Sequence, residues 1–327
     1  MGSPGNQQLA MLESTAPVTI PLRDEILAIR QLFGYSDACH SASEASSLGT
    51  RLPNSSMKDV LFIGIDVDTY QGYERLATDP QLHIGVSILD TRVLHNLTLK
   101  ELDLVYETDA LESYQFIVGD SRYCKTASRK FMFGKSQSIP LAEVKAHIES
   151  LVCSRSRDYI LVFHGDHSDR KALANLNIDL RPLYIIDNVK AAQYPLGLPY
   201  RLGLEAMLDT FGIPYADLHT AGNDAHYALR SMLMIAVADG QKMGLEPAKQ
   251  ALFSTLVAIA RKERPSTVGE KAAAFEESRR QVKAEKAARH KARRAARTER
   301  RKQEREAQIQ LDDEYSSAKD DTILDKT

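Results

Sequence analysis

Residues 219–229 read "HTAGNDAHYAL" and place His219 five positions before Asp224, at the start of a helix. The helix is predicted by apolar residues at helical spacing, namely Ala225, Ala228, Leu229, Met232, Ile235 and Ala236. Asp224 lies one turn before Ala228, at the edge of this apolar face, so its carboxylate should point toward the interior. We expect the neighbouring His226 to lie either at the surface or in a supporting position, in contact with the directly acting residues rather than with a ligand. The small residues between His219 and Asp224 should leave room for the histidine side chain to extend across the start of the helix.

Apolar runs of strand length occur on the N-terminal side of this helix. They are "DVLFIGIDVD" (59–68), "HIGVSILD" (83–90), "YILVFHG" (159–165) and "LYIIDN" (183–188), and each has the β-branched residues of a buried strand. Helices are predicted at 140–152, 168–176, 202–212, 223–240 and 246–263. Two early strands followed by alternating helices and strands predict an α/β fold, a mixed β-sheet with helices on its faces.

The rest of the chain is organised around this domain, which we place at residues 58–264. Residues 1–57 are predicted to be an extension that begins disordered, contains a short amphipathic helix from Asp24 to Phe33, and ends in a linker over 37–56. Residues 265–327 form a charged low-complexity tail, basic and then acidic. The alanine stripe of this tail suits a helix but buries too little apolar surface to pack a core.

The formal net charge of −2 is unevenly distributed over the 327 residues. Residues 283–306 contain eleven Lys and Arg against four Glu, a local charge of +7, so the remainder carries −9. A basic arm on an acidic body can accompany nucleic-acid binding or nuclear import. A solvated, charged helix explains the same composition equally well.

Composition also excludes several classes of protein. No apolar run approaches the roughly 18 to 20 residues that span a bilayer, and the N-terminus has no secretory signal pattern, so we expect no membrane partner. The three cysteines, Cys39, Cys124 and Cys153, form no CxxC pair, which argues against a disulfide framework. An intracellular location, cytoplasmic or nuclear, fits best.

Two carboxylates stand at the end of the first predicted strand. Asp66 and Asp68 are two residues apart and therefore share one face of the strand. Like charges at this separation are costly unless a cation compensates them. A purely structural role, in which the pair ends the strand and starts a turn, is about equally consistent with this pattern.

A third acid follows the strand at 159–165, in "VFHGDHSDRKAL" (162–173). Ser168 is the expected N-cap of the next helix, and Asp169 falls in its first turn, where the helix dipole favours a negative charge. Asp169 is also four residues before Leu173 on the buried face, so its carboxylate should lean toward the sheet. The competitor Asp166 lies in the turn and has no fixed direction.

These placements suit a site for hard divalent cations. Mg²⁺ and Mn²⁺ prefer carboxylate oxygens, and two such ions about 3.5 to 4 Å apart can hold a phosphodiester during in-line attack by water. In that arrangement Asp66, Asp68, Asp169 and Asp224 hold the metals, and His219 takes the proton from the water. Zinc hydrolysis through His164 and His167 is a weaker alternative, because carboxylates dominate the site.

At these residues the chain resembles the DEDDh branch of the RNase H-like 3′-to-5′ exonucleases. The family motifs look like Asp66-Val67-Asp68, His164 to Asp169, and His219 to Asp224-Ala225, over roughly residues 60–238. "HTAGNDA" further resembles a fungal group in which H-x-A-G-N-D-A recurs. The sister branch has a tyrosine four residues before the last aspartate, where this chain has Thr220, so the histidine branch is favoured.

The resemblance implies a two-metal (Mg²⁺ or Mn²⁺) exonuclease that acts on a single-stranded 3′ end of RNA or DNA. Asp68 replaces the glutamate of the first family motif, which shortens its reach by one methylene and puts activity, not fold, in question. The alternative function is therefore a weak or inactive RNase H-like module that binds nucleic acid or acts as an adaptor. A third hypothesis is a helical scaffold organised by the tail. It is the weakest, because it gives no role to the domain at residues 58–264.

Overall fold

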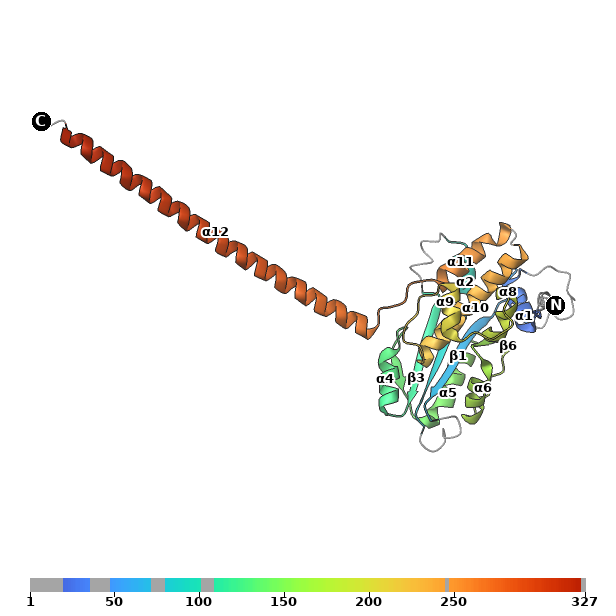
Figure 1. The fold of residues 1–327 in the computed structure, drawn as a ribbon. Helices are drawn as coiled ribbons and strands as arrows, with labels where there is room; N and C mark the ends of the chain where they lie inside the picture. Colours follow the sequence, from blue (N-terminus) through green and yellow to red (C-terminus); the bar gives the residue numbers. More distant parts are fainter. Residues whose placement is uncertain (1–19, 36–47, 72–79, 101–108, 245–246, 325–327) are drawn as a thin grey trace, which may run out of the picture. The chain divides into compact units, whose positions relative to one another are not determined.

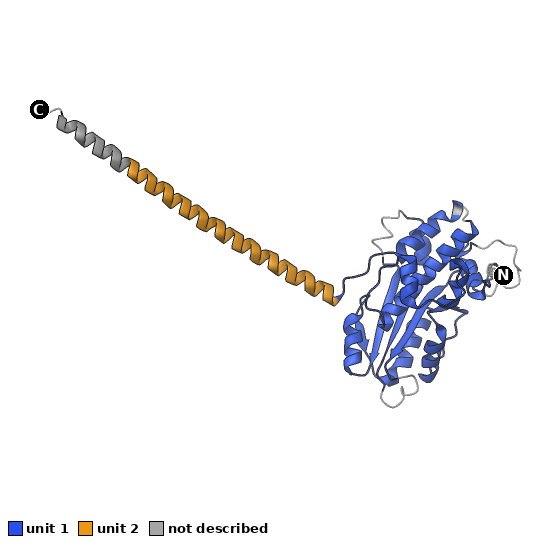
Figure 2. Ribbon diagram, in the orientation of Figure 1, with its two compact units in different colours: residues 1–267 blue, residues 268–327 orange. Residues whose placement is uncertain are grey.

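The computed structural model describes residues 20–35, 48–71, 80–100, 109–244 and 247–324. The chain divides into two compact units, residues 1–267 and 268–327 (Figure 2). The disorder that we expected over the first residues, and most of the expected linker, lie outside the described residues.

A mixed sheet forms the centre of the first unit, as predicted (Figure 1). Among the described residues its strands are β1 (Leu61–Thr69), β2 (Leu82–Asp90), β3 (Leu111–Val118), β4 (Ser136–Ser138), β5 (Tyr159–Phe163) and β6 (Tyr184–Asp187). They lie in the order β4-β3-β2-β1-β5-β6. β2 is antiparallel to β1 and β3, and the pairs β1–β5, β5–β6 and β3–β4 are parallel.

Helices surround this sheet. They are α1 (Asp24–Phe33), α2 (Thr91–Thr98), α4 (Arg122–Lys130), α5 (Leu141–Cys153), α6 (Asp166–Asn175), α7 (Asn188–Ala191), α8 (Gln193–Leu196), α9 (Leu204–Phe211), α10 (Ala221–Met243) and α11 (Gln250–Ala260), the last after a 3₁₀ turn at Pro247–Lys249. The helices that we predicted correspond to α1, α5, α6, α9, α10 and α11. The strands β3 and β4 and the helices α2, α4, α7 and α8 were not predicted.

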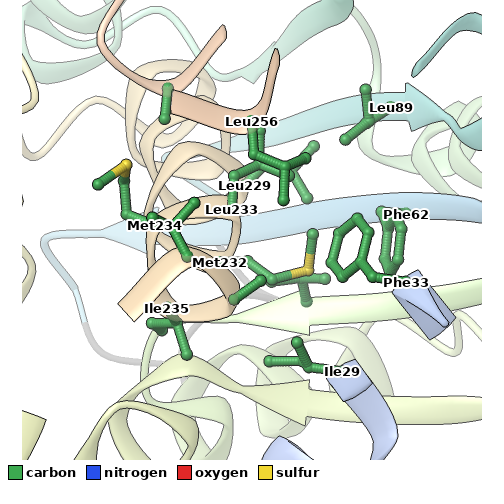
Figure 3. Packing of buried hydrophobic residues seen from close by; sticks show 14 of the residues in the cluster. Ile29, Phe33, Phe62, Leu89, Leu229, Met232, Leu233, Met234, Ile235 and Leu256 are labelled. Carbon is green, nitrogen blue, oxygen red and sulfur yellow. The ribbon is translucent and has the colours of Figure 1, made fainter. Parts of the chain in front are cut away.

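The hydrophobic core has two layers, one on each face of the sheet. Side chains alternate along β1, so Phe62 packs on the face covered by α10, while Leu61 and Ile63 pack on the face covered by α5 and α6. Figure 3 shows the first layer, where α10 contributes Leu229, Met232, Leu233 and Ile235 and α11 contributes Leu256. All the residues of the predicted α10 stripe are buried.

The helix α1 belongs to this core. Its apolar side chains are buried (Ile26, Ile29, Leu32 and Phe33), and Phe33 stacks on Phe62 of β1 with ring centroids 5.3 Å apart (Figure 3). The guanidinium of Arg30 donates to both oxygens of Asp239 in α10, at 2.8 and 2.9 Å. α1 is therefore part of the first unit, although the sequence led us to assign it to an extension before residue 58.

Two glycines let α10 approach the sheet closely. A Cβ at Gly85 of β2 would lie 1.9 Å from the carbonyl oxygen of Ala221, and a Cβ at Gly64 of β1 would lie 2.5 Å from that of Ala225. Glycine inside a strand commonly marks such an approach of another backbone. The first two turns of α10 consequently rest directly on the backbones of β1 and β2.

Replacement of Gly85 by alanine is expected to destabilise the protein by about 3 kcal/mol. The three nearest atoms all belong to the backbone of Ala221 and Gly222, so α10 would have to shift. For a unit of this size the melting temperature should fall by roughly 10 °C. The matched control is Gly203→Ala, since Gly203 has φ −67° and a Cβ at this position would meet nothing within 4 Å. Thermal unfolding of both variants measures the difference, and equal melting temperatures would contradict the expectation.

The second unit is the helix α12 (Val268–Leu324). Its residues 268–310 are exposed, and ion pairs run along its surface, such as Arg300 with Glu304 at 2.8 Å. It corresponds to the charged tail of the sequence and is helical, and residues 268–310 form no core. In the part of the chain that the structure describes, no helix combines the length and the apolar character needed to cross a membrane.

Candidate active site

Three elements bring the four acids to one end of the sheet. Asp66 and Asp68 lie on β1 and share its face with Gly64, which α10 covers. Asp224 comes from the first turn of α10 and is partly buried. Asp169 comes from α6 and is 6% exposed; its Oδ1 accepts the N–H of Val67, between the two β1 acids, at 2.9 Å.

The start of α6 differs from the predicted one. Gly165, with φ 88°, occupies the N-cap position, and its N–H donates to Asp187 Oδ1 at 3.0 Å. Ser168 is therefore inside the first turn, and our N-cap prediction was wrong because the chain leaves β5 through a left-handed glycine. Asp166 is the first helical residue and has a fixed direction, since it pairs with Arg170 at 3.1 Å and Lys190 at 3.8 Å.

Side chains from the sheet cap the start of α10. The N–H of Ala221 donates to His83 Nδ1 at 3.1 Å, and the N–H of Gly222 donates to Gln115 Oε1 at 2.9 Å. A Cβ at Gly222 would lie 2.6 Å from the ring of Phe131. Residues 221 and 222 are small because they pack against the sheet and this ring. We had expected small residues here for another reason, to give the side chain of His219 freedom of movement.

The loop that carries His219 is strained and anchored. Asp217 has φ 49° and His219 has φ 58°, a left-handed conformation that is uncommon for residues other than glycine. The N–H of His219 donates to Asp224 Oδ2 at 2.9 Å, and its side chain is exposed. The histidine thus stands at the mouth of the site, tied through its backbone to the aspartate that follows it.

Asn223 holds this loop in place. Its Oδ1 accepts the N–H of Met132 at 3.0 Å, and its Nδ2 donates to the carbonyls of Lys130 and Asp217 at 3.0 and 2.9 Å. Asn223 is fully buried. One side chain therefore joins the start of α10, the end of α4 and the loop before His219.

Replacement of Asn223 by alanine is expected to cost about 3 kcal/mol, because three partly buried backbone groups, at Met132, Lys130 and Asp217, lose their partner. Amide hydrogen exchange should increase at Met132, whose N–H loses its acceptor. Thr210→Ala is the control, since the Thr210 hydroxyl also donates to a backbone carbonyl but is exposed; we expect a change within about half a kcal/mol there. Unchanged exchange at Met132 would contradict the anchoring role.

Three of the acids, Asp66, Asp169 and Asp224, lie in a desolvated environment. Burial, and then the charges of Asp169, Asp224 and Asp68, hold the pKa of Asp66 well above its ordinary value. Burial also raises the pKa of Asp169 and that of Asp224 to about 7, although the N–H groups of Val67 and His219 act in the opposite direction. The carboxylates are therefore near enough to repel one another, and a nearby cation would offset this repulsion.

The donor atoms fit hard divalent cations. Asp224 Oδ1 is buried and has no hydrogen-bond partner, and oxygen is the ligand atom that Mg²⁺ and Mn²⁺ prefer. Within the described ranges no group of three or more His, Cys, Asp or Glu side chains lies close enough together to hold one ion. Ion binding at these residues therefore requires adjustment of the carboxylates relative to one another.

The environment of Asp68 includes two residues that the sequence had not indicated. His83 Nε2 lies 3.7 Å from Asp68 Oδ2. Because His83 Nδ1 accepts the Ala221 N–H, Nε2 carries the proton of the neutral ring, and burial lowers the pKa of His83 to about 4. Tyr123 of α4 stacks on His83 with ring centroids 4.9 Å apart. His83 could have been noticed in the sequence as a histidine inside an apolar strand, whereas no feature of the sequence indicated Tyr123.

The other histidines of these motifs have different surroundings. His226 is 6% exposed, stacks on Phe133 at 3.5 Å and shares a hydrogen bond of 2.9 Å with Ser113, so a surface position was wrong. His164 donates from Nε2 to the carbonyl of Leu202 at 3.1 Å, and His167 is exposed. Both line a cavity of about 650 Å³ beside α6.

A mixed sheet with carboxylates converging from β1, α6 and α10 defines an RNase H-like α/β domain. Residues 61–235 match the sequence model of DEDDh_C, described as the DNA polymerase III subunit epsilon-like, C-terminal domain. The chain therefore belongs to this family of DEDDh exonucleases in the RNase H-like superfamily. No curated protein matches the chain. The finer likeness to a fungal group stays a prediction.

Proposed function

We propose that the protein is a 3′-to-5′ exonuclease that hydrolyses phosphodiester bonds at single-stranded ends of RNA or DNA. The observation that carries the proposal is the convergence of Asp66, Asp169 and Asp224 from three elements. Besides burial, the charges of Asp169 and Asp224 raise the pKa of Asp66, and the charge of Asp169 raises the pKa of Asp224. A fold has no structural need for such a repulsive group, whereas a cation-binding site does.

Each residue has a distinct role in the proposed reaction. Asp66, Asp68, Asp169 and Asp224 would hold two Mg²⁺ or Mn²⁺ ions, which supply charge stabilisation and a water of lowered pKa when bound. Val67 fixes Asp169 through its N–H, and the N–H of His219 fixes Asp224. His219 accepts the proton of the attacking water, because its side chain is exposed next to Asp224, which its backbone N–H contacts, and histidine is the side chain that most often acts as a general base.

Degradation of labelled oligonucleotides tests the function. RNA and DNA strands labelled at the 5′ end should give a ladder that shortens from the 3′ end, only when Mg²⁺ or Mn²⁺ is present. The ladder also identifies the preferred polymer. Intact strands in both metals, from folded protein that still retards RNA on a gel, would favour the alternative of a binding or adaptor module.

Asp68 is the residue that favours this alternative, since it is shorter than the glutamate of the family motif. Its side chain is 32% exposed and lies beside His83. If the ladder is weak, Asp68→Glu should strengthen it, because the longer side chain reaches one methylene further. Activity of the Asp68→Glu variant that equals the weak wild type would exclude reach as the cause.

A further inference from the structure

The exposed face of α4 is strongly cationic. The sequence of this helix, "RYCKTASRK", contains four basic residues and no acid. Arg122, Lys125 and Arg129 are exposed and, together with Ser128, line a groove of about 570 Å³. Spacings of three and four residues place these side chains along one face of a helix. The groove therefore offers three positive charges in a row over roughly 10 Å.

Of the four basic residues of α4, Lys130 pairs with Asp217 at 3.6 Å, whereas the three that line the groove have no acidic partner within the described ranges. Among the described residues no ion pair involves Arg122, Lys125 or Arg129, and Arg129 Nε donates to a backbone carbonyl, that of Lys125, at 3.3 Å. A solvated charged helix looks different, as α12 shows with pairs such as Arg279–Glu276 and Lys302–Glu306. The unpaired charges of α4 are thus available to an anionic partner, on a chain whose net charge outside residues 283–306 is −9.

A different face of α4, which carries Tyr123, contacts the residues of the candidate active site. Tyr123 follows Arg122 directly and stacks on His83, which lies beside Asp68. Burial, and then the charge of Asp68, raise the pKa of Tyr123. Tyr70, 59% exposed, meets the Tyr123 ring edge-on at 5.2 Å. The helix that carries the cationic groove therefore also contacts, through Tyr123, the residues beside Asp68, and the exposed ring of Tyr70 lies next to Tyr123.

We propose that the α4 groove binds the sugar-phosphate backbone of the single strand whose 3′ end lies at the acids, with Tyr70 available for base stacking. This inference rests on the proposed nuclease function and names the binding surface for its substrate. Phosphate contacts position a strand without reading its bases, and aromatic stacking tolerates any base. The groove therefore predicts a preference for longer strands and little preference for sequence.

The test compares the full chain with Arg122→Ala/Lys125→Ala/Arg129→Ala. The matched control is Arg51→Ala/Lys100→Ala/Arg181→Ala, which removes three exposed cations from other segments. Affinity for 5′-fluorescein-labelled 12-nucleotide oligouridylate and oligothymidylate is measured by anisotropy in EDTA, over a series of salt concentrations. The tail is identical in all three proteins, so differences between them report the substituted surface.

In the α4 variant we expect the Kd to rise about 10- to 30-fold. The slope of log affinity against log salt should become shallower by about 2, as the loss of three phosphate contacts to a single strand predicts. In Mn²⁺ the kcat/KM for the 12-mer should fall similarly, while that for a dinucleotide stays within twofold. The control should stay within twofold throughout.

Two outcomes separate this inference from the proposed function. An unchanged Kd and salt slope in the α4 variant, with an unchanged ratio of 12-mer to dinucleotide cleavage, would overturn the groove while wild-type cleavage upheld the nuclease. A weakened Kd in the α4 variant alone, with no cleavage by wild type, would support the groove and reject the nuclease.

Discussion

Asp169→Asn is expected to abolish metal-dependent hydrolysis, with a loss of at least about 10³-fold in kcat, because several kcal/mol of charge stabilisation depend on the ions. Asparagine keeps the acceptor for the Val67 N–H, so the fold should be retained. The rate of 3′-end shortening in Mn²⁺ measures the loss. Asp166→Asn, in the same turn of α6, is the control and should retain activity within a few fold.

The same variant should be more stable than wild type when metal is absent. The pKa of Asp169 is about 7 in the folded protein, above its ordinary value near 3.9. Between pH 4 and 7 the folded state therefore binds more protons than the unfolded state, and the stability of wild type falls as pH rises through this window. Asparagine removes that penalty.

Melting temperatures in EDTA at pH 5 and pH 7.5 measure this effect. At pH 7.5 we expect Asp169→Asn to be more stable than wild type by about 2 to 4 kcal/mol, with a smaller gain at pH 5. Millimolar Mn²⁺ should raise the melting temperature of wild type and raise that of the variant less. A variant that is no more stable than wild type at pH 7.5 would show that the four carboxylates do not repel one another as inferred.

His219→Ala is expected to lower kcat by about 10²- to 10⁴-fold, the usual contribution of a general base. Its stability should change little, because the side chain is exposed and the loop is held by the side chains of Asp224 and Asn223. The stabilisation by Mn²⁺ should be retained, in contrast to Asp169→Asn. Single-turnover cleavage measures the loss of rate, and melting curves with and without Mn²⁺ measure the stability and its increase by the metal.

His167→Ala is the matched control, since it removes another exposed histidine next to the site. Under the proposed mechanism its activity should stay within twofold of wild type. Loss of activity in His167→Ala together with retention in His219→Ala would reverse the assignment. It would then favour the zinc alternative, in which His164 and His167 share a metal.

The buried strands and long helices were predictable because their apolar residues are contiguous or periodic. β3 was missed because Glu112, Ser113 and Gln115 interrupt its apolar character. The polar side chains of this strand have partners far away in sequence: Ser113 meets His226 of α10, and Gln115 caps Gly222. Such partners are fixed only by the tertiary fold, and they turn residues that look solvent-exposed into buried ones.

The residues of the candidate site differ in the same way: some were predictable from local spacing and others depend on the tertiary fold. Spacing on one strand or helix face predicted the directions of Asp169 and Asp224, because both depend on local geometry. α4 was missed since only Cys124 and Ala127 of its residues are buried. Tyr123 and the cationic groove depend on where this short helix docks, and a single sequence carries no signal for that.

The capping of α10 restricts how the site can meet a phosphate. Its first amides are already engaged, those of Ala221 and Gly222 by His83 and Gln115, and those of Asn223 and Asp224 by the carbonyl of Thr220. A helix N-terminus with free N–H groups is a ready anion site, but this one has no donors left to offer. Negative charge on a substrate must therefore be balanced by cations, whether bound ions or basic side chains, and substrate affinity should respond strongly to ionic strength.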